Sequence, residues 1–150
     1  MKKNDVSLKT IKRTAKSFFK HAICHYAEKN LTYDDEIQCI CSLQGTLELI
    51  LKYLFVEQKG FESLFIKNSE KTRNFGDLLK EARTDNLLDI QQEDFDLIRK
   101  FQDCRNQICH FGLLEIPHDL TNKIIELIIN VFSELEYKEM LYSQNEEMNS

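Results

Sequence analysis

The segment EIQCICSLQGTLELILKYLFVEQ, residues 36–58, carries apolar side chains at the three- and four-residue spacing of one helix face. This pattern predicts a long amphipathic helix with a broad buried stripe. Residues 30–35 offer caps before the helix, and Lys59-Gly60 ends it. The predicted stripe consists of Ile37, Ile40, Leu43, Leu47, Ile50, Leu51, Leu54 and Phe55.

The same helical period recurs along the rest of the chain and predicts four further helices. Their expected ranges are residues 5–29, 75–83, 91–111 and 118–142, with a polar connector at residues 60–75. One Pro and four Gly among 150 residues are too few for the many turns of a sandwich or barrel. We therefore expect an all-α fold, an antiparallel bundle of four long helices plus one short helix.

The chain is long enough for one hydrophobic core. A chain of this length buries roughly 70% of its unfolded surface, so it needs no disulfide or metal to fold. We expect residues 1–142 to form a single helical domain and residues 143–150, which have nothing to bury, to be a flexible C-terminal tail. The core is expected to contain Phe18, Leu47, Leu51, Phe101, Ile108, Leu127 and Val131.

The sequence indicates a cytoplasmic protein with no membrane contact. The N-terminus, MKKNDVSLKTIKR, lacks the apolar core of a signal peptide. The most apolar stretch, residues 124–132, is too short and too polar to span a membrane.

In a reducing compartment the cysteines are expected to be buried small hydrophobes. They are Cys24, Cys39, Cys41, Cys104 and Cys109.

Charge is spread unevenly over a chain whose formal net charge is −5. Residues 1–20 carry seven Lys or Arg against one acidic residue, and residues 134–150 carry five Glu against one Lys. A third group of basic residues lies in and beside the polar connector. Such clusters are usually solvated faces, but they also attract anionic ligands such as RNA. The group consists of Lys67, Lys71, Arg73, Lys80 and Arg83.

Residues 101–112, FQDCRNQICHFG, place Arg105, Asn106 and His110 near the end of an otherwise apolar helix. Five positions along a helix correspond to roughly 7.5 Å of rise and about 140° of rotation. One helix therefore cannot easily aim Arg105 and His110 at a single atom. Two such helices packed across a two-fold axis could gather both sets of side chains around one cleft.

These side chains suit the cleavage of a phosphodiester. The Arg fork matches phosphate oxygens, His takes or gives a proton near neutrality, and Asn orients the imidazole or holds a non-bridging oxygen. The sequence has no acidic cluster of the kind that holds catalytic magnesium. We therefore expect no metal and no other cofactor, and an RNA 2′-hydroxyl as the nucleophile. Surface or capping roles are compatible with the same three residues.

The segment Arg105-Asn-Gln-Ile-Cys-His110 resembles the Arg-x4–6-His motif of the HEPN superfamily, in the common form with Asn directly after Arg. Glu48 and Lys52 resemble the Glu-x3-Lys helix of that family. Residues 74–82, NFGDLLKEA, resemble its short helix before the motif helix. The order and lengths of the expected helices agree with the family over most of the chain.

The resemblance implies a helical bundle that forms a homodimer through the motif helices. Many HEPN proteins are metal-independent endoribonucleases of toxin–antitoxin and antiphage systems. By this resemblance Arg105 and His110 are catalytic, and Asn106 positions His110 or the phosphate. Glu48 and Lys52 are auxiliary residues in or beside the site. The implied partners are a second copy of the chain, an RNA substrate and a cognate antitoxin or defence-system protein.

Two other functions fit the sequence. A non-catalytic HEPN-like domain could bind a partner protein as an adaptor or neutralising subunit, which suits the net charge of −5. A regulatory ligand-binding domain would instead use His21 and His25, which are four residues apart on one helix face, to hold a metal.

Overall fold

The computed structural model describes residues 3–112 and 117–148, which form five α-helices and no strand. Four of these helices are long and one is short, so the predicted all-α fold class is confirmed. The helices are α1 (Lys3–Tyr26), α2 (Tyr33–Lys59), α3 (Phe75–Thr84), α4 (Gln92–Phe111) and α5 (His118–Met148), and one 3-10 turn, η1 (Phe61–Leu64), follows α2.

Helix α2 begins at Tyr33, three residues before the predicted start. The reason is a reciprocal cap: the hydroxyl of Thr32 accepts a hydrogen bond from the backbone N–H of Asp35, and the Asp35 carboxylate accepts one from the backbone N–H of Thr32, both at 3.1 Å. At the other end Gly60 has a φ of 89°, a backbone conformation that side-chain-bearing residues rarely adopt. The cap and the glycine together define the length of this helix.

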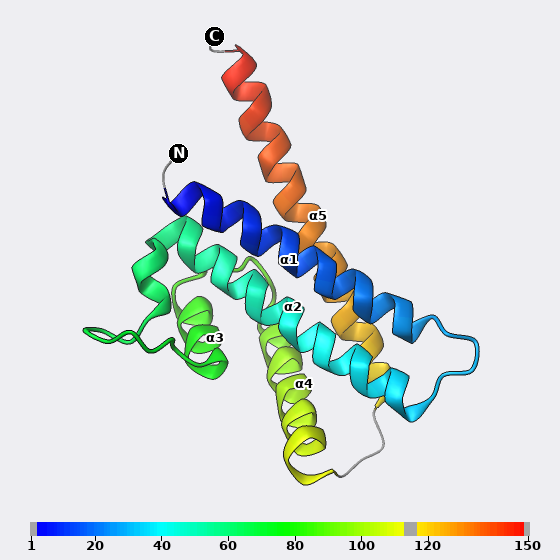
Figure 1. Ribbon diagram of the computed structural model, residues 1–150. Coiled ribbons are helices and arrows are strands. Elements are labelled where there is room, and N and C mark those ends of the chain that lie inside the picture. Colours follow the sequence, from blue (N-terminus) through cyan, green and yellow to red (C-terminus); the bar gives the residue numbers. More distant parts are fainter. Residues whose placement is uncertain (1–2, 113–116, 149–150) are drawn as a thin grey trace.

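Helix α2 is the central helix of the molecule. Figure 1 shows α1 running alongside α2 in the opposite direction, with α4 crossing them and α5 extending past them at its C-terminal end. Among the described residues α2 alone has the length and composition of a membrane span, but 72% of that apolar window is buried inside the molecule. This burial is typical of the core helix of a bundle.

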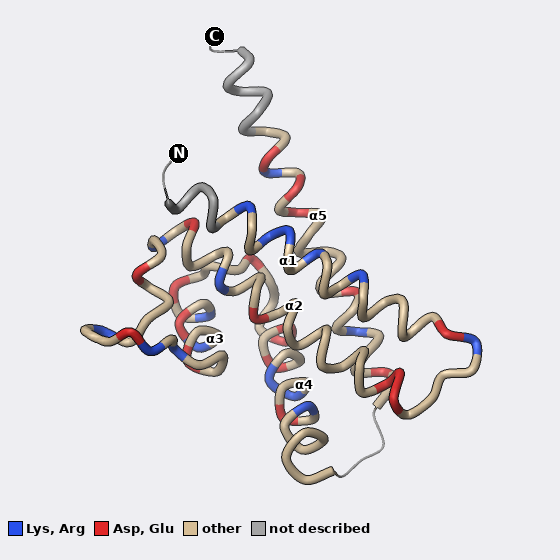
Figure 2. The backbone as a smooth tube through the Cα atoms, viewed as in Figure 1, with Lys and Arg blue, Asp and Glu red and all other residues tan. Residues whose placement is uncertain are grey.

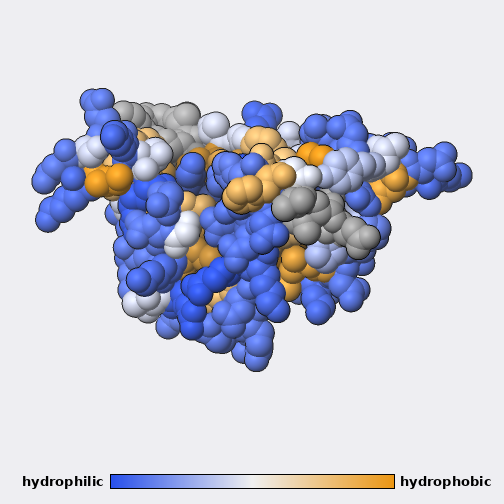
Figure 3. Space-filling view, turned by 90° about the horizontal axis from the view of Figure 1, so that it is seen from below, coloured by the Kyte–Doolittle hydropathy of each residue, from blue (hydrophilic) through white to orange (hydrophobic). Residues whose placement is uncertain are grey.

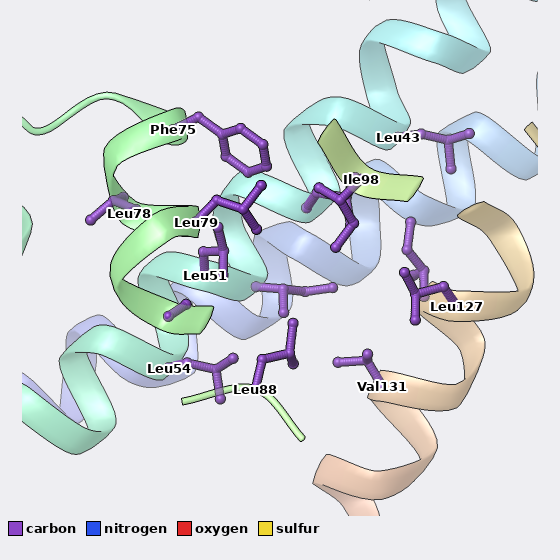
Figure 4. Close-up of a cluster of buried hydrophobic side chains, with 14 of the residues drawn as sticks. Leu43, Leu51, Leu54, Phe75, Leu78, Leu79, Leu88, Ile98, Leu127 and Val131 are labelled. Atoms are coloured by element: carbon purple, nitrogen blue, oxygen red, sulfur yellow. The ribbon is translucent and has the colours of Figure 1, made fainter. Parts of the chain in front are cut away.

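The core lies between α2 and the helices α3, α4 and α5, whose apolar side chains converge in Figure 4. Leu51 of α2, Ile98 of α4 and Val131 of α5 line one small shared cavity. Six of the seven predicted core residues are buried. They are Leu47, Leu51, Phe101, Ile108, Leu127 and Val131.

The prediction that Phe18 belongs to the core is wrong, because 42% of its surface is exposed. A Cβ atom at Gly45 would lie 3.7 Å from the Phe18 ring, so the ring lies on the surface of α2 at a position where glycine leaves room. The helical period correctly places Phe18 on the side of α1 that faces α2. It does not reveal that the ring stays partly exposed beside Gly45.

Opposite charges join α1 to α5. The Nζ atom of Lys16 lies 2.7 Å from Oε1 of Glu136, and Lys12 pairs with Glu139. Figure 2 shows the basic residues of α1 facing the part of α5 that carries acidic residues. Part of the basic N-terminal cluster is thus neutralised within the molecule, which reduces its attraction for an external anion.

The connector between α2 and α3 is more regular than its polar sequence suggests. After η1, the backbone N–H of Ile66 donates to the carbonyl of Lys71 at 2.9 Å, and that of Arg73 donates to the carbonyl of Leu64 at 2.8 Å. The Arg73 guanidinium also donates to the carbonyl of Ser63 at 3.1 Å. These bonds close the connector into a compact loop ahead of α3.

Two predicted helix ends differ from the structure by three residues or more. Helix α1 ends at Tyr26 instead of residue 29, and α5 continues to Met148, six residues beyond its predicted end. Residues 118–150 contain no Gly or Pro, so nothing in the chain interrupts α5 near residue 142. A fading apolar stripe therefore does not mark the end of this helix.

Substitution of Phe101 and Phe18 should separate core packing from surface contact. Phe101 is 1% exposed, so Phe101→Ala should lower the free energy of unfolding by about 3–5 kcal/mol. Phe18→Ala, the matched control, should lower it by about 1 kcal/mol or less. Urea denaturation followed by circular dichroism measures both values. Equal losses for the two variants would contradict the assignment of Phe18 to the surface.

Candidate active site at the end of helix α4

The motif residues lie on the last two turns of α4. The helix starts at a cap formed by Gln91 and Asp94, and it ends at Gly112, whose φ of 62° is left-handed. The backbone N–H of Gly112 donates to the carbonyl of Ile108, which closes the last turn. Figure 1 shows this end of α4 projecting away from the other helices. The motif therefore occupies a protruding helix end.

Arg105 is half-buried, and its guanidinium is already bound on one side. Its Nη1 donates a hydrogen bond to Oδ1 of the neighbouring Asn106 at 3.1 Å. Its Nε is buried and has no hydrogen-bond partner among the described residues. The side chain also interacts electrostatically with Cys41 of α2. Arg105 is thus held between α4 and α2, while Asn106 limits where its fork can point.

Asn106 and His110 are four residues apart, so they share one face of α4. Asn106 is half-buried, whereas His110 is exposed in the last turn. The next residue, Phe111, has 71% of its surface exposed, an unusual amount for an aromatic side chain. Figure 3, which views the molecule from the side on which α4 projects, shows apolar patches within a mostly hydrophilic surface.

Within one chain the structure does not bring Arg105 and His110 together on one face. The helix is regular from Gln92 to Phe111, so the rotation of about 140° between these positions holds. The structure joins Arg105 to Asn106 by a hydrogen bond, and it leaves His110 one turn further along on the adjacent exposed face. A site that uses both types of side chain would therefore need an Arg or a His from another helix.

Two thiols meet beside Arg105. The side chains of Cys41 of α2 and Cys109 of α4 interact with each other. Burial, followed by the contacts with Cys109, raises the pKa of Cys41, and the positive charge of Arg105 partly opposes this rise. The prediction that all five cysteines are buried is wrong, because Cys24 and Cys109 are exposed. Sequence spacing could not reveal the Cys41–Cys109 contact, since it joins two helices.

Glu48 and Lys52 are half-buried on α2, on the same side of the helix as Cys41 and Gly45. No hydrogen bond or ion pair joins either of them to Arg105, Asn106 or His110 among the described residues. Their auxiliary role therefore stays a prediction.

Arg73 is occupied by contacts within the chain. Its Nε donates to Asp77 at 2.8 Å, its Nη2 donates to Glu81 at 3.1 Å, and its guanidinium lies 5.4 Å from the centre of the Phe55 ring. Burial raises the pKa of Glu81, but the hydrogen bonds from Arg73 and Lys59 outweigh it and leave that pKa lowered. The exposed members of the predicted RNA-binding group are Lys67, Lys71, Lys80 and Arg83.

The predicted metal pair consists of two histidines in edge-to-face contact, with the ring centres of His21 and His25 4.5 Å apart. The Nδ1 atom of His25 lies 2.9 Å from Oδ1 of Asp35. That hydrogen bond is the main reason why the pKa of Asp35 is lowered. Across residues 3–112 and 117–148 no group of three or more His, Cys, Asp or Glu side chains is placed to hold a metal ion. In the structure His25 thus connects α1 to the start of α2.

Comparison of the chain with models of protein families, with curated proteins and with solved structures gave no match. The residues of this chain are therefore the only basis for assigning it a function.

Cysteine alkylation should follow the burial of the five thiols. Burial raises the pKa of Cys39 to about 12, so at about pH 8 almost none of it is the reactive thiolate. We expect iodoacetamide to alkylate Cys24 and Cys109 in the native protein and to reach Cys39 only after unfolding. Peptide mass spectrometry at several times measures this order. Rapid alkylation of Cys39 in the folded protein would contradict it.

Proposed function

We propose that the chain is a metal-independent endoribonuclease of the HEPN type that acts as a toxin or antiphage-defence effector in the cytoplasm. The observation that carries the proposal is the Arg105–Asn106 hydrogen bond on the projecting end of α4, one turn before the exposed His110. This end presents a phosphate-binding fork, an amide and a titratable imidazole on an accessible surface.

Each motif residue has a role in transesterification. The RNA 2′-oxygen attacks phosphorus, forming the O2′–P bond, while the P–O5′ bond breaks. One His110 accepts the proton from the 2′-hydroxyl, and a second His110 gives a proton to the leaving 5′-oxygen. Arg105 stabilises the charge that develops on the non-bridging oxygens. Asn106 holds the Arg105 fork and orients the phosphate or the imidazole.

Two copies of the chain are needed because the reaction uses two histidines and one chain offers one motif. The pairing we propose brings the ends of two α4 helices together across a two-fold axis. The exposed Phe111 supports this surface as the contact, because association would remove a large apolar side chain from water. The single cleft of the dimer would then hold Arg105, Asn106 and His110 from both copies.

Wild-type protein should cleave total RNA in the presence of EDTA, and Arg105→Ala and His110→Ala should each lower the rate by about 100-fold or more. Arg105→Ala removes the charge that stabilises the transition state, and His110→Ala removes the proton carrier. Gel analysis of RNA over time, with initial rates at equal protein concentrations, measures the effect.

Arg99→Ala and His21→Ala are matched controls for these variants, since each removes the same type of side chain from an exposed position. Both should cleave RNA at the wild-type rate. Circular dichroism and size-exclusion chromatography should show the same helicity and the same dimer for all variants. Wild-type cleavage that neither motif substitution reduces would disprove the assigned site.

RNA binding should depend on the exposed lysines of the connector. Each phosphate contact contributes about 0.7 to the slope of log affinity against log salt for a single strand. The double variant Lys67→Ala with Lys71→Ala should therefore lower the magnitude of that slope by about 1.4. Fluorescence anisotropy with a labelled 2′-O-methyl RNA at several salt concentrations measures it. An unchanged slope would exclude these lysines from the RNA path.

A second function, a non-catalytic module that binds a partner protein, is favoured by the far end of the molecule. A cleft of about 550 Å³ lies between α2, the segment before α4, and α5, and no motif residue lines it. The nearby side chains of Tyr137, Met140 and Leu141 on α5 are exposed. A folded dimer that cleaves no RNA would favour this second function.

A further inference from the structure

Two buried side-chain atoms have no hydrogen-bond partner among the described residues. They are Oε1 of Gln44 and Nε of Arg105. Gln44 is only 3% exposed, so its oxygen is removed from bulk water. One of these atoms is an acceptor and the other is a donor. Because buried polar groups are nearly always hydrogen-bonded in folded proteins, two complementary unpaired groups require an explanation.

The helical period places Gln44 on the side of α2 that faces α4. Leu51 of α2 lines a small cavity together with Ile98 of α4. Gln44 precedes Leu51 by seven residues, which is about two helical turns, so both side chains leave α2 on the same side.

Two contacts, one on either side of Gln44 in α2, indicate which part of α4 lies opposite Gln44. Cys41 of α2 interacts with Arg105 of α4, and Leu47 of α2 lines the same cavity as Ile98 of α4. Gln44 lies midway between Cys41 and Leu47 in α2. It therefore faces the part of α4 between Ile98 and Arg105, where the unpaired Nε is buried.

We propose that Gln44 is a positioning residue for Arg105, whose Nε donates a hydrogen bond to the Gln44 amide oxygen. Formation of this bond requires the ends of the two side chains to rotate toward each other. Nη1 keeps its bond to Asn106, so two of the three guanidinium nitrogens are held. The plane of the fork is thereby fixed, and Nη2 stays available for a phosphate oxygen.

A neutral amide suits this position. A carboxylate would accept the same hydrogen bond more strongly, but its charge would weaken the attraction of Arg105 for phosphate. An apolar side chain of similar size would leave Nε unpaired. The catalytic consequence of this inference rests on the proposed function, whereas the hydrogen bond does not.

The hydrogen bond can be tested by nuclear magnetic resonance without any substrate. In protein labelled with ¹⁵N-arginine, the Nε–H signal of Arg105 is assigned by its loss in Arg105→Lys. Gln44→Met should speed the exchange of this hydrogen with water by about tenfold, because the acceptor is gone. Gln38→Met, which changes an exposed glutamine of α2, is the matched control and should leave it unchanged. Equal exchange in Gln44→Met and wild type would overturn the proposal.

Gln44→Glu gives a second test that does not depend on the folding of Gln44→Met. The charged acceptor should shift the Arg105 Nε–H signal downfield, as a stronger hydrogen bond does. A signal that stays at its wild-type position in Gln44→Glu would also overturn the proposal.

Kinetics test the positioning role. Gln44→Met should lower kcat for RNA cleavage by about tenfold with KM within about twofold, because the fork loses orientation but keeps its charge. Gln44→Glu should mainly raise KM. If wild-type protein cleaves no RNA while the exchange result holds, the proposed function fails and the Gln44–Arg105 bond stands. If Gln44→Met leaves kcat unchanged, the positioning role fails and the proposed function stands.

Discussion

The contact between α2 and α4 buries polar side chains together with apolar ones. The candidate site depends on this contact because it determines the surroundings of Arg105. At one end of the contact Leu47, Leu51 and Ile98 form part of the core. At the other end Arg105 is half-buried close to Cys41, with its Nε removed from water. The apolar end holds the two helices in register, and this register determines which side chains of α2 surround the guanidinium.

Most of the fold could be predicted from the sequence because each helix has its own apolar period and its own breaks. Residues 36–58 carry such a clear stripe that α2 differs from its predicted range by three residues at the capped start and by one residue at its end. Phe18 shows the limit of this approach, because its exposure depends on Gly45 of another helix. The end of α5 was also missed, since a helix continues where the residues allow it even without an apolar stripe.

The candidate site was predictable only as far as it lies on one helix. Arg105, Asn106 and His110 could be singled out because their spacing within a single segment is visible in the sequence. Gln44 and the Cys41–Cys109 contact could not be found in this way, because both depend on the packing of α2 against α4. Arg73 is a further example: its charge is visible in the sequence, but its ion pairs with Asp77 and Glu81 are not.

The proposed activity requires one cleft formed by the ends of two α4 helices. A dilution series that passes through the dissociation of the proposed dimer tests this requirement most directly. At each concentration the specific rate of RNA cleavage in EDTA is measured. A composite site predicts that the rate per chain falls in proportion to the fraction of dimer determined by sedimentation at the same concentrations. A rate per chain that stays constant where the protein is monomeric would contradict it.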